Sequence, residues 1–206
     1  LGQVGPAARD AEAVVLAGVS AGGIGATLSY GRAAQALVPA PVHLLADGGP
    51  VPLDAAAFDP ALQRQWIETW GLSLPAGCLD CDPGRGPGLG AVLPFWTRRY
   101  PDRRFGAVAF QDDVALRILY GAVGPECADE RGPTCKLTPD AYAAGLQSVR
   151  DALPTDAAAL FVLPGEGHTS LLSPELFDRA SGATALTDWL GTLATGGVLP
   201  EVGTVP

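Results

Sequence analysis

Four short runs of apolar residues recur along the chain, and each is continuous rather than alternating with polar residues. They cover residues 13–17, 42–46, 105–110 and 158–163. A strand buried on both faces shows this pattern, because neither of its faces meets water. The pattern therefore predicts four strands of a mostly parallel sheet.

Helical segments are expected between and after these runs. Residues 23–37 are rich in Ala and Leu, and residues 113–120, 139–152 and 181–194 have apolar positions three and four apart. The last segment opens with Ser181, a residue type that caps helices. Strands that alternate with helices indicate an α/β fold with helices on both faces of the sheet.

Two stretches interrupt the alternation. Residues 53–99 hold three of the four tryptophans, and residues 121–137 hold two of the four cysteines. We expect both stretches to be disulfide-stapled insertions above the sheet that shape a substrate pocket. The Gly- and Pro-rich tail, residues 196–206, is expected to be irregular. No domain boundary is visible, so residues 1–206 are interpreted as part of a single domain.

Charge and composition narrow the class of protein. The chain has 206 residues, of which 48% are hydrophobic, and a formal net charge of −9. An acidic surface repels phosphate backbones, so no nucleic-acid partner is expected. No apolar run approaches the roughly 18 residues that a membrane span requires, so none is predicted. The chain begins at Leu1 and contains no Met, which suggests a processed or excised piece of a longer precursor.

The four cysteines predict disulfides and an oxidising compartment. Among the three possible connectivities we expect the local pairs Cys78–Cys81 and Cys127–Cys135. A four-thiolate zinc site is the alternative. It suits the Cys-x-x-Cys spacing of the first pair but not the seven residues between the members of the second. Free thiols are a third possibility.

The segment Gly18–Gly22 reads Gly-Val-Ser-Ala-Gly and joins the first predicted strand to the first predicted helix. A Gly-x-Ser-x-Gly turn in this context holds a serine above the sheet as a nucleophile, here Ser20. The N–H of Ala21, at the start of the helix, is then an oxyanion donor. The alternatives are a plain turn or a phosphate-binding loop, although the Gly-Lys-Ser/Thr of a P-loop is absent.

A nucleophilic serine needs a neutral imidazole nearby, and the chain has only two histidines. His43 lies inside an apolar run and is interpreted as a buried, hydrogen-bonded strand residue. His168 follows the last predicted strand, where hydrolases of this layout carry their base. Its alternative is a surface loop residue.

The third member of such a site is a carboxylate that orients the imidazole. Asp47 follows the second predicted strand, and Asp112 and Asp113 follow the third. All three stand between serine and histidine in chain order. Asp112 also suits a helix N-cap, and Asp47 suits an Asx turn. The pattern alone does not separate them.

These segments together resemble the pectin acetylesterase/Notum family of carboxylesterases. Residues 16–25 resemble its serine motif, and residues 44–49 resemble its Asp-Ser-Gly segment, with Gly48 in place of Ser. Residues 111–113 resemble its Gln-x-Asp, and residues 167–169 resemble the segment that carries its base. The resemblance extends over roughly residues 14–172.

The resemblance implies an α/β-hydrolase-like fold, an oxygen-ester substrate and a Ser20–Asp113–His168 triad. It also implies secretion, so a secreted or periplasmic location is expected. The mechanism of such a triad needs no metal or organic cofactor. Asp47 is then expected as a structural or substrate-pocket residue close to the serine, and Gly22 in the substrate pocket. Trp70, with two further tryptophans of the first insertion, is expected either to line a sugar or acyl surface or to pack in a lid.

One departure from the family is large. Its other oxyanion donors come from a glycine-rich loop well upstream of the serine, yet only 19 residues precede Ser20 here. Loss of one such donor costs on the order of 100- to 1000-fold in rate. We therefore expect this chain to be the C-terminal part of the domain, without its N-terminal strands. The expected partner is the N-terminal half of the same precursor.

The expected function is that of a serine carboxylesterase that forms an acyl-enzyme on Ser20. Its ester would carry an acetyl or other acyl group, with a polysaccharide or polyester among the candidate substrates. An amidase or peptidase uses the same groups. A non-catalytic binding or scaffold protein on a hydrolase fold is the alternative from another class, because fold does not dictate function.

Overall fold

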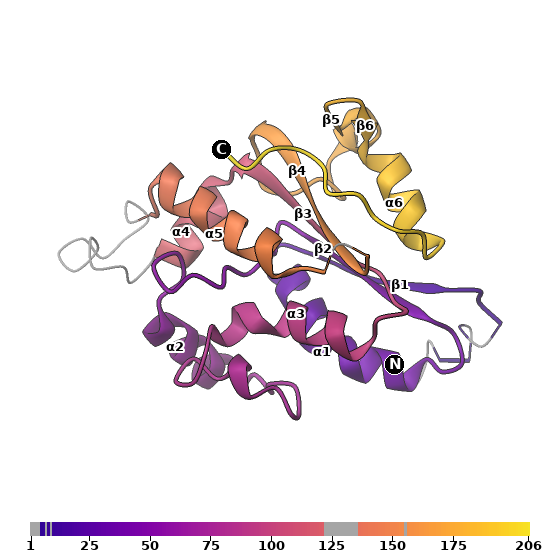
Figure 1. Ribbon diagram of the computed structural model, residues 1–206, viewed down its shortest axis with the longest axis horizontal. Coiled ribbons are helices and arrows are strands. Elements are labelled where there is room, and N and C mark those ends of the chain that lie inside the picture. The colour runs from indigo at the N-terminus through magenta and orange to yellow at the C-terminus, as the bar shows by residue number, and fades with distance from the viewer. Residues whose placement is uncertain (1–4, 7, 9, 122–135, 155) are drawn as a thin grey trace.

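A single parallel sheet organises the structure (Figure 1). The computed structural model describes residues 5, 6, 8, 10–121, 136–154 and 156–206. The four strands are β1 (Val14–Val19), β2 (Val42–Asp47), β3 (Phe105–Asp112) and β4 (Ala158–Glu166). They lie in the order β1-β2-β3-β4, and every neighbouring pair is parallel. The four predicted strands are confirmed, and each continues a little beyond its predicted end.

Six α-helices accompany the sheet in the described part of the chain. They are α1 (Ala21–Ala36), α2 (Pro60–Trp70), α3 (Val92–Arg99), α4 (Val114–Gly121), α5 (Pro139–Ala152) and α6 (Leu186–Ala194). The prediction that the last helix begins at Ser181 is wrong. Gly182 has a φ of 59° and turns the chain between two short strands, β5 (Ala180–Ser181) and β6 (Thr184–Ala185), so the helix begins later.

The helices cover the two faces of the sheet unequally (Figure 1). Side chains of a strand alternate between faces. On β3, Phe105 and Ala107 therefore pack in the clusters that contain α1, α3 and α5. Val108 and Phe110 point the other way, toward α6 and the C-terminal tail. Helices thus lie on both faces, as predicted, with most of them on one.

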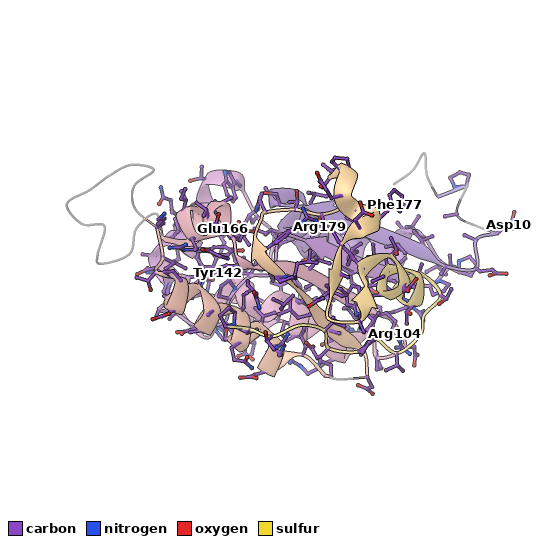
Figure 2. All side chains as sticks on the ribbon, turned by 90° about the horizontal axis from the view of Figure 1, so that it is seen from above. Asp10, Arg104, Tyr142, Glu166, Phe177 and Arg179 are labelled. Atoms are coloured by element: carbon purple, nitrogen blue, oxygen red, sulfur yellow. A yellow bond between two sulfur atoms is a disulfide. The ribbon has the colours of Figure 1, made fainter. Side chains whose placement is uncertain are left out.

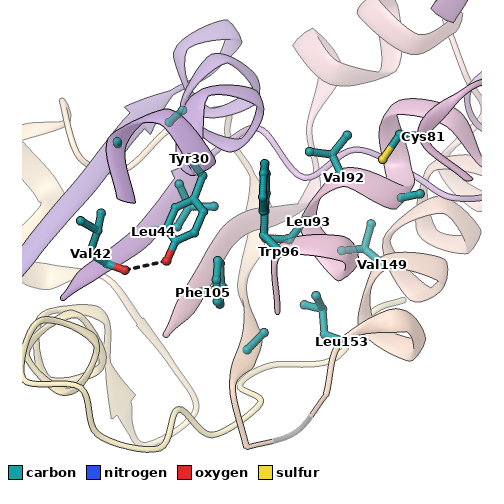
Figure 3. Close-up of a cluster of buried hydrophobic side chains, with 14 of the residues drawn as sticks. Tyr30, Val42, Leu44, Cys81, Val92, Leu93, Trp96, Phe105, Val149 and Leu153 are labelled. Atoms are coloured by element: carbon teal, nitrogen blue, oxygen red, sulfur yellow. Dashed lines mark hydrogen bonds between the residues drawn. The ribbon is translucent and has the colours of Figure 1, made fainter. Parts of the chain in front are cut away.

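The larger helical layer contains part of the predicted first insertion (Figure 3). Trp96 of α3 is buried, contacts the ring of Tyr30, and donates from its indole N–H to the carbonyl of Thr27. The Tyr30 hydroxyl in turn donates to the carbonyl of Val42 on β2. Residues 53–99 therefore do not stand wholly above the sheet, because α3 forms part of the core.

The two edges of the sheet differ. The outer edge of β4 is covered by the tail, since the N–H of Val162 donates to the carbonyl of Val202 at 2.8 Å. The tail is irregular, as expected, but Val202 is buried. In the described part of the chain β1 has no strand on its outer side, and Val15 is 36% exposed.

One of the two predicted disulfides is confirmed. Cys78 and Cys81 are bonded beside the short 3₁₀ helix η1 (Leu79–Cys81), so this pair is not a pair of zinc thiolates. Cys127 and Cys135, with most of the predicted second insertion, lie outside the described residues. Among the described helices, none is both long and apolar enough to cross a membrane.

On the face of the sheet that α6 covers, two aromatic residues are expected to contribute unequally to the free energy of unfolding. Trp189 of α6 is 1% exposed, packs on Phe161 and donates to the carbonyl of Pro200. Trp189→Ala is expected to lower the free energy of unfolding by about 3–5 kcal/mol, because it leaves a cavity. Phe177, which is 79% exposed and stands at the molecular surface in Figure 2, should change it by only about 0.5 kcal/mol when replaced by Ala. Urea denaturation measures both values, and equal losses would contradict this packing.

Candidate active site

Three polar side chains meet at the carboxyl end of the sheet. Ser20 follows β1, Asp113 follows β3 and His168 follows β4. Because all four strands are parallel, the turns that follow them lie at one end of the sheet. In Figure 2, Glu166 marks this end and Arg104, just before β3, marks the other.

Ser20 occupies a strained turn. Its φ is 57° and its ψ is −126°, and no other non-glycine residue in the described part of the chain has a positive φ. Its N–H donates to the carbonyl of Asp47 at 2.7 Å, and its carbonyl accepts from Gly23 at 2.8 Å. A Cβ on Gly18 would lie 1.9 Å from the carbonyl oxygen of Gly22, so only glycine fits there. Strain of this kind persists only where the surroundings impose it, and it collects at functional sites.

Helix α1 begins directly after this serine. The first N–H groups of an α-helix have no partner within the helix, and they carry a partial positive charge. The Ser20 side chain does not cap them. Ala21 and Gly22 are exposed, and a Cβ on Gly22 would meet no atom within 4 Å. The start of α1 thus offers backbone donors and open space beside the serine.

His168 connects the other two side chains. Its Nε2 lies 2.6 Å from the Ser20 hydroxyl oxygen, and its Nδ1 lies 2.9 and 3.0 Å from the two carboxylate oxygens of Asp113. An ionised carboxylate only accepts hydrogen bonds, so Nδ1 carries the proton and Nε2 is free to accept from the hydroxyl. The His168 side chain is 32% exposed, which leaves the imidazole open to a ligand.

Asp113 is fully buried beneath the imidazole. Its Oδ1 also accepts from the N–H of Leu116 at 2.9 Å, in the first turn of α4. Burial raises the pKa of the Asp113 carboxyl, and the hydrogen bonds from Leu116 and His168 oppose this rise. The carboxylate is therefore held in place by a helix start as well as by the histidine.

The other two carboxylates that sequence patterns left open have different partners. Asp112 forms an ion pair with Arg117 at 2.8 Å. Asp47 accepts from the backbone N–H groups of Ser170 and Leu171. Among these three carboxylates, Asp113 is the one that hydrogen-bonds to the imidazole of His168. The roles of Ser170 and Leu171 were not visible in the sequence, because only their backbone takes part.

The residues expected in a substrate pocket have different surroundings. Asp47 is fully buried, so of its two expected roles it fits a structural residue rather than the lining of an open pocket. Gly22 is exposed beside Ser20. Trp70, at the end of α2, is 55% exposed and stacks on the buried Trp66, with ring centroids 4.8 Å apart.

The second histidine lies away from the site. His43 is buried in β2, and its Nδ1 accepts from the N–H of Arg104 at 2.9 Å, as expected for a strand histidine. Burial lowers the pKa of His43. In the described residues, no group of three or more His, Cys, Asp or Glu side chains is arranged to hold a metal ion.

The similarity of this chain to known proteins is one of structure. No protein-family model and no curated protein matches the chain. Among solved structures, the Wnt deacylase Notum from Drosophila is similar over 90% of this chain, with a TM-score of 0.53 and 20% identity. The chain spans 55% of that structure's length. At this identity the likeness concerns the fold, and the predicted α/β-hydrolase-like fold is confirmed.

Because Ser20 has a positive φ, glycine should stabilise this position relative to alanine. Inside a helix, glycine has the opposite effect. Ser20→Gly is expected to be about 1 kcal/mol more stable to unfolding than Ser20→Ala, because glycine alone accepts a positive φ without strain. Ser29 is exposed inside α1, and there Ser29→Gly should be about 1 kcal/mol less stable than Ser29→Ala. Thermal unfolding of the four variants tests this. The same order at both positions would show that Ser20 is not strained.

Proposed function

We propose that this protein is a serine carboxylesterase that cleaves an oxygen ester through an acyl-enzyme on Ser20. One observation carries the proposal: hydrogen bonds link Ser20 to His168 and His168 to Asp113, with the serine on a strained turn at a helix start. The structural neighbour is a deacylase, an enzyme that removes acyl groups, which supports the same class of reaction.

In the first half of the proposed reaction, Ser20 attacks the ester carbonyl. As its oxygen bonds to the carbonyl carbon, His168 Nε2 accepts the hydroxyl proton. Asp113 fixes the orientation of the imidazole and stabilises its positive charge. The N–H of Ala21 donates to the carbonyl oxygen as negative charge develops on it.

The second half returns the enzyme to its starting state. The imidazolium of His168 gives its proton to the departing alcohol oxygen as the ester bond breaks, and the acyl group stays on Ser20. A water molecule then transfers a proton to His168 and attacks the acyl carbon. Collapse of this intermediate releases the carboxylic acid, and the proton returns to Ser20. No metal or organic cofactor takes part in these steps.

We assign Gly22 and Trp70 to the substrate surface. The open space above Gly22 admits an acyl or alcohol group next to Ser20. Trp70 offers an exposed ring of the kind that packs on sugars or acyl chains, and the aromatic contacts of Trp66 with Trp70 and Tyr120 fix its position. The proposed substrate is therefore an acetyl or larger acyl ester, with polysaccharides and polyesters as candidate carriers.

We further propose that the outer edge of β1 is paired in the working enzyme. An exposed apolar edge strand is a template for another strand, and Val15 lies exposed on this one. Because Ser20 follows β1 directly, a strand added beside β1 would bring a neighbouring loop to the serine and supply a second oxyanion donor. The proposed source is the N-terminal half of the same precursor. A secreted or periplasmic location is supported by the Cys78–Cys81 disulfide.

Ester hydrolysis by matched variants tests the proposed reaction. Ser20→Ala is expected to abolish turnover, and Asp113→Asn to lower kcat by about 10⁴-fold, because the imidazole then takes the wrong tautomer. Asp112→Asn changes the adjacent carboxylate, which pairs with Arg117 instead, and should retain most of the activity. Initial rates with short and long acyl esters measure these effects. Unchanged turnover in Ser20→Ala would instead favour a binding or scaffold protein.

Native mass spectrometry of protein from its natural source tests the proposed partner. We expect a complex with a second polypeptide of the same precursor, and Val15→Lys should weaken it because a charge blocks an edge strand. Val38, which is 68% exposed in the turn after α1, provides the control Val38→Lys, which should leave the complex intact. A single active species of 21.0 kDa would contradict the proposal.

A further inference from the structure

Asp47, the last residue of β2, hydrogen-bonds to both the segment that carries the proposed nucleophile and the segment that carries the proposed base. The carbonyl of Asp47 accepts from the N–H of Ser20 at 2.7 Å. Its carboxylate Oδ2 accepts from the N–H groups of Ser170 and Leu171, both at 2.7 Å. Ser170 and Leu171 belong to the loop that carries His168, residues 167–171 (the base loop). One residue therefore joins the serine turn to the histidine loop.

These bonds are made inside the protein. Asp47 is fully buried, and burial raises its pKa, although the bonds from Leu171 and Ser170 oppose the rise. Its other oxygen, Oδ1, is buried with no hydrogen-bond partner among the described residues. A buried carboxylate that is only half satisfied is costly to the fold. The Asp47 carboxylate therefore holds the loop through its two backbone bonds, while its burial lowers overall stability.

The residue after Asp47 brings the same two segments into contact. Gly48 has a φ of 63°, and a Cβ built on it would lie 2.4 Å from the carbonyl oxygen of His168. The base loop therefore lies directly on the β2 turn, at a distance that a larger residue would not permit. Elsewhere in this loop, Gly167 donates to the carbonyl of Asp112 at 3.1 Å. The loop is thus held at both of its ends.

We propose that Asp47, together with Gly48, positions His168 against Ser20, an inference that rests on the proposed function. No hydrogen bond joins the Asp47 carboxylate to the imidazole or to the serine hydroxyl among the described contacts, so it is a positioning residue. The two backbone bonds set where the base loop lies, and the close approach at Gly48 sets how near it lies to the sheet. Together they allow the 2.6 Å contact between Nε2 and the hydroxyl.

Two substitutions at Asp47 separate hydrogen bonding from charge. Asp47→Ala removes the acceptor and leaves two backbone N–H groups unpaired. It should lower kcat by about 100-fold with little change in KM, because the base moves off its position. Asp47→Asn keeps an oxygen that accepts from Ser170 and Leu171, so it should restore most of the rate.

Two glycine variants separate crowding from backbone strain. Gly48→Ala adds a methyl group that presses on the His168 carbonyl, and it should lower kcat as Asp47→Ala does. Gly182 has a nearly identical φ of 59°, but a Cβ there would meet nothing within 4 Å. Gly182→Ala therefore bears the same strain without the contact, and its kcat should stay at the wild-type value.

Proton NMR of the imidazole rings provides a readout that does not depend on activity. The chain has only His43 and His168, so the Nδ1 proton that His168 shares with Asp113 can be followed separately. We expect this downfield resonance in wild type, Asp47→Asn and Gly182→Ala. It should shift or vanish in Asp47→Ala and Gly48→Ala, while the ring-carbon protons of His43 stay unchanged and report an intact fold.

The outcomes distinguish this proposal from the proposed function. An unchanged His168 resonance and kcat in Asp47→Ala, or an Asp47→Asn variant as impaired as Asp47→Ala, would overturn the positioning role. If the resonances change as expected but wild-type protein hydrolyses no ester, the positioning role stands and the proposed function fails. Gly48→Ala tests the same contact from the other residue if Asp47→Ala does not fold.

Discussion

Parallel pairing of the four strands is the constraint on which the candidate site depends. Each strand brings the turn that follows it to the same end of the sheet. Ser20 and His168 are 148 residues apart in the chain, yet their side chains lie at hydrogen-bond distance. Asp113, from the turn after β3, hydrogen-bonds to Nδ1 of the same imidazole. No local segment of the chain contains this arrangement, so it exists only when the sheet is formed.

The candidate site lowers the stability of the folded protein. A serine with a positive φ and two buried carboxylates, Asp47 and Asp113, are each unfavourable on their own. Apolar side chains packed on both faces of the sheet provide the compensating stability. Backbone donors then hold both carboxylates, from Leu116 for Asp113 and from the base loop for Asp47. The result is a rigid set of polar groups beneath a partly exposed imidazole.

Much of this fold was predictable from the sequence. Continuous apolar runs identify buried strands, and all four are present. Ser20 stands in a strand-to-helix glycine motif, and of the two histidines only His168 follows a predicted strand. The start of α6 was not predictable, because the hairpin at Gly182 replaces its expected first turn.

The carboxylate that contacts His168 and the surroundings of Asp47 were less predictable. Asp112 and Asp113 are adjacent, and the register of β3 against β4 shifts between Phe110 and Asp112, so side-chain direction there depends on tertiary structure. Asp47 follows a strand just as they do, but its backbone partners lie 123 and 124 residues away. Contacts over such distances are invisible to local patterns. The sequence around Asp47 also does not show whether its carboxylate is exposed or buried.

Reaction of the native protein with a fluorophosphonate, followed by mass spectrometric mapping, tests the central claim most directly. The reagent bonds to a serine only when a base activates it. The account predicts a stoichiometric adduct on Ser20 that is absent after His168→Ala. Correctly folded protein that forms no adduct, or an adduct on Ser20 that persists without His168, would contradict the proposal that these residues form the reactive centre.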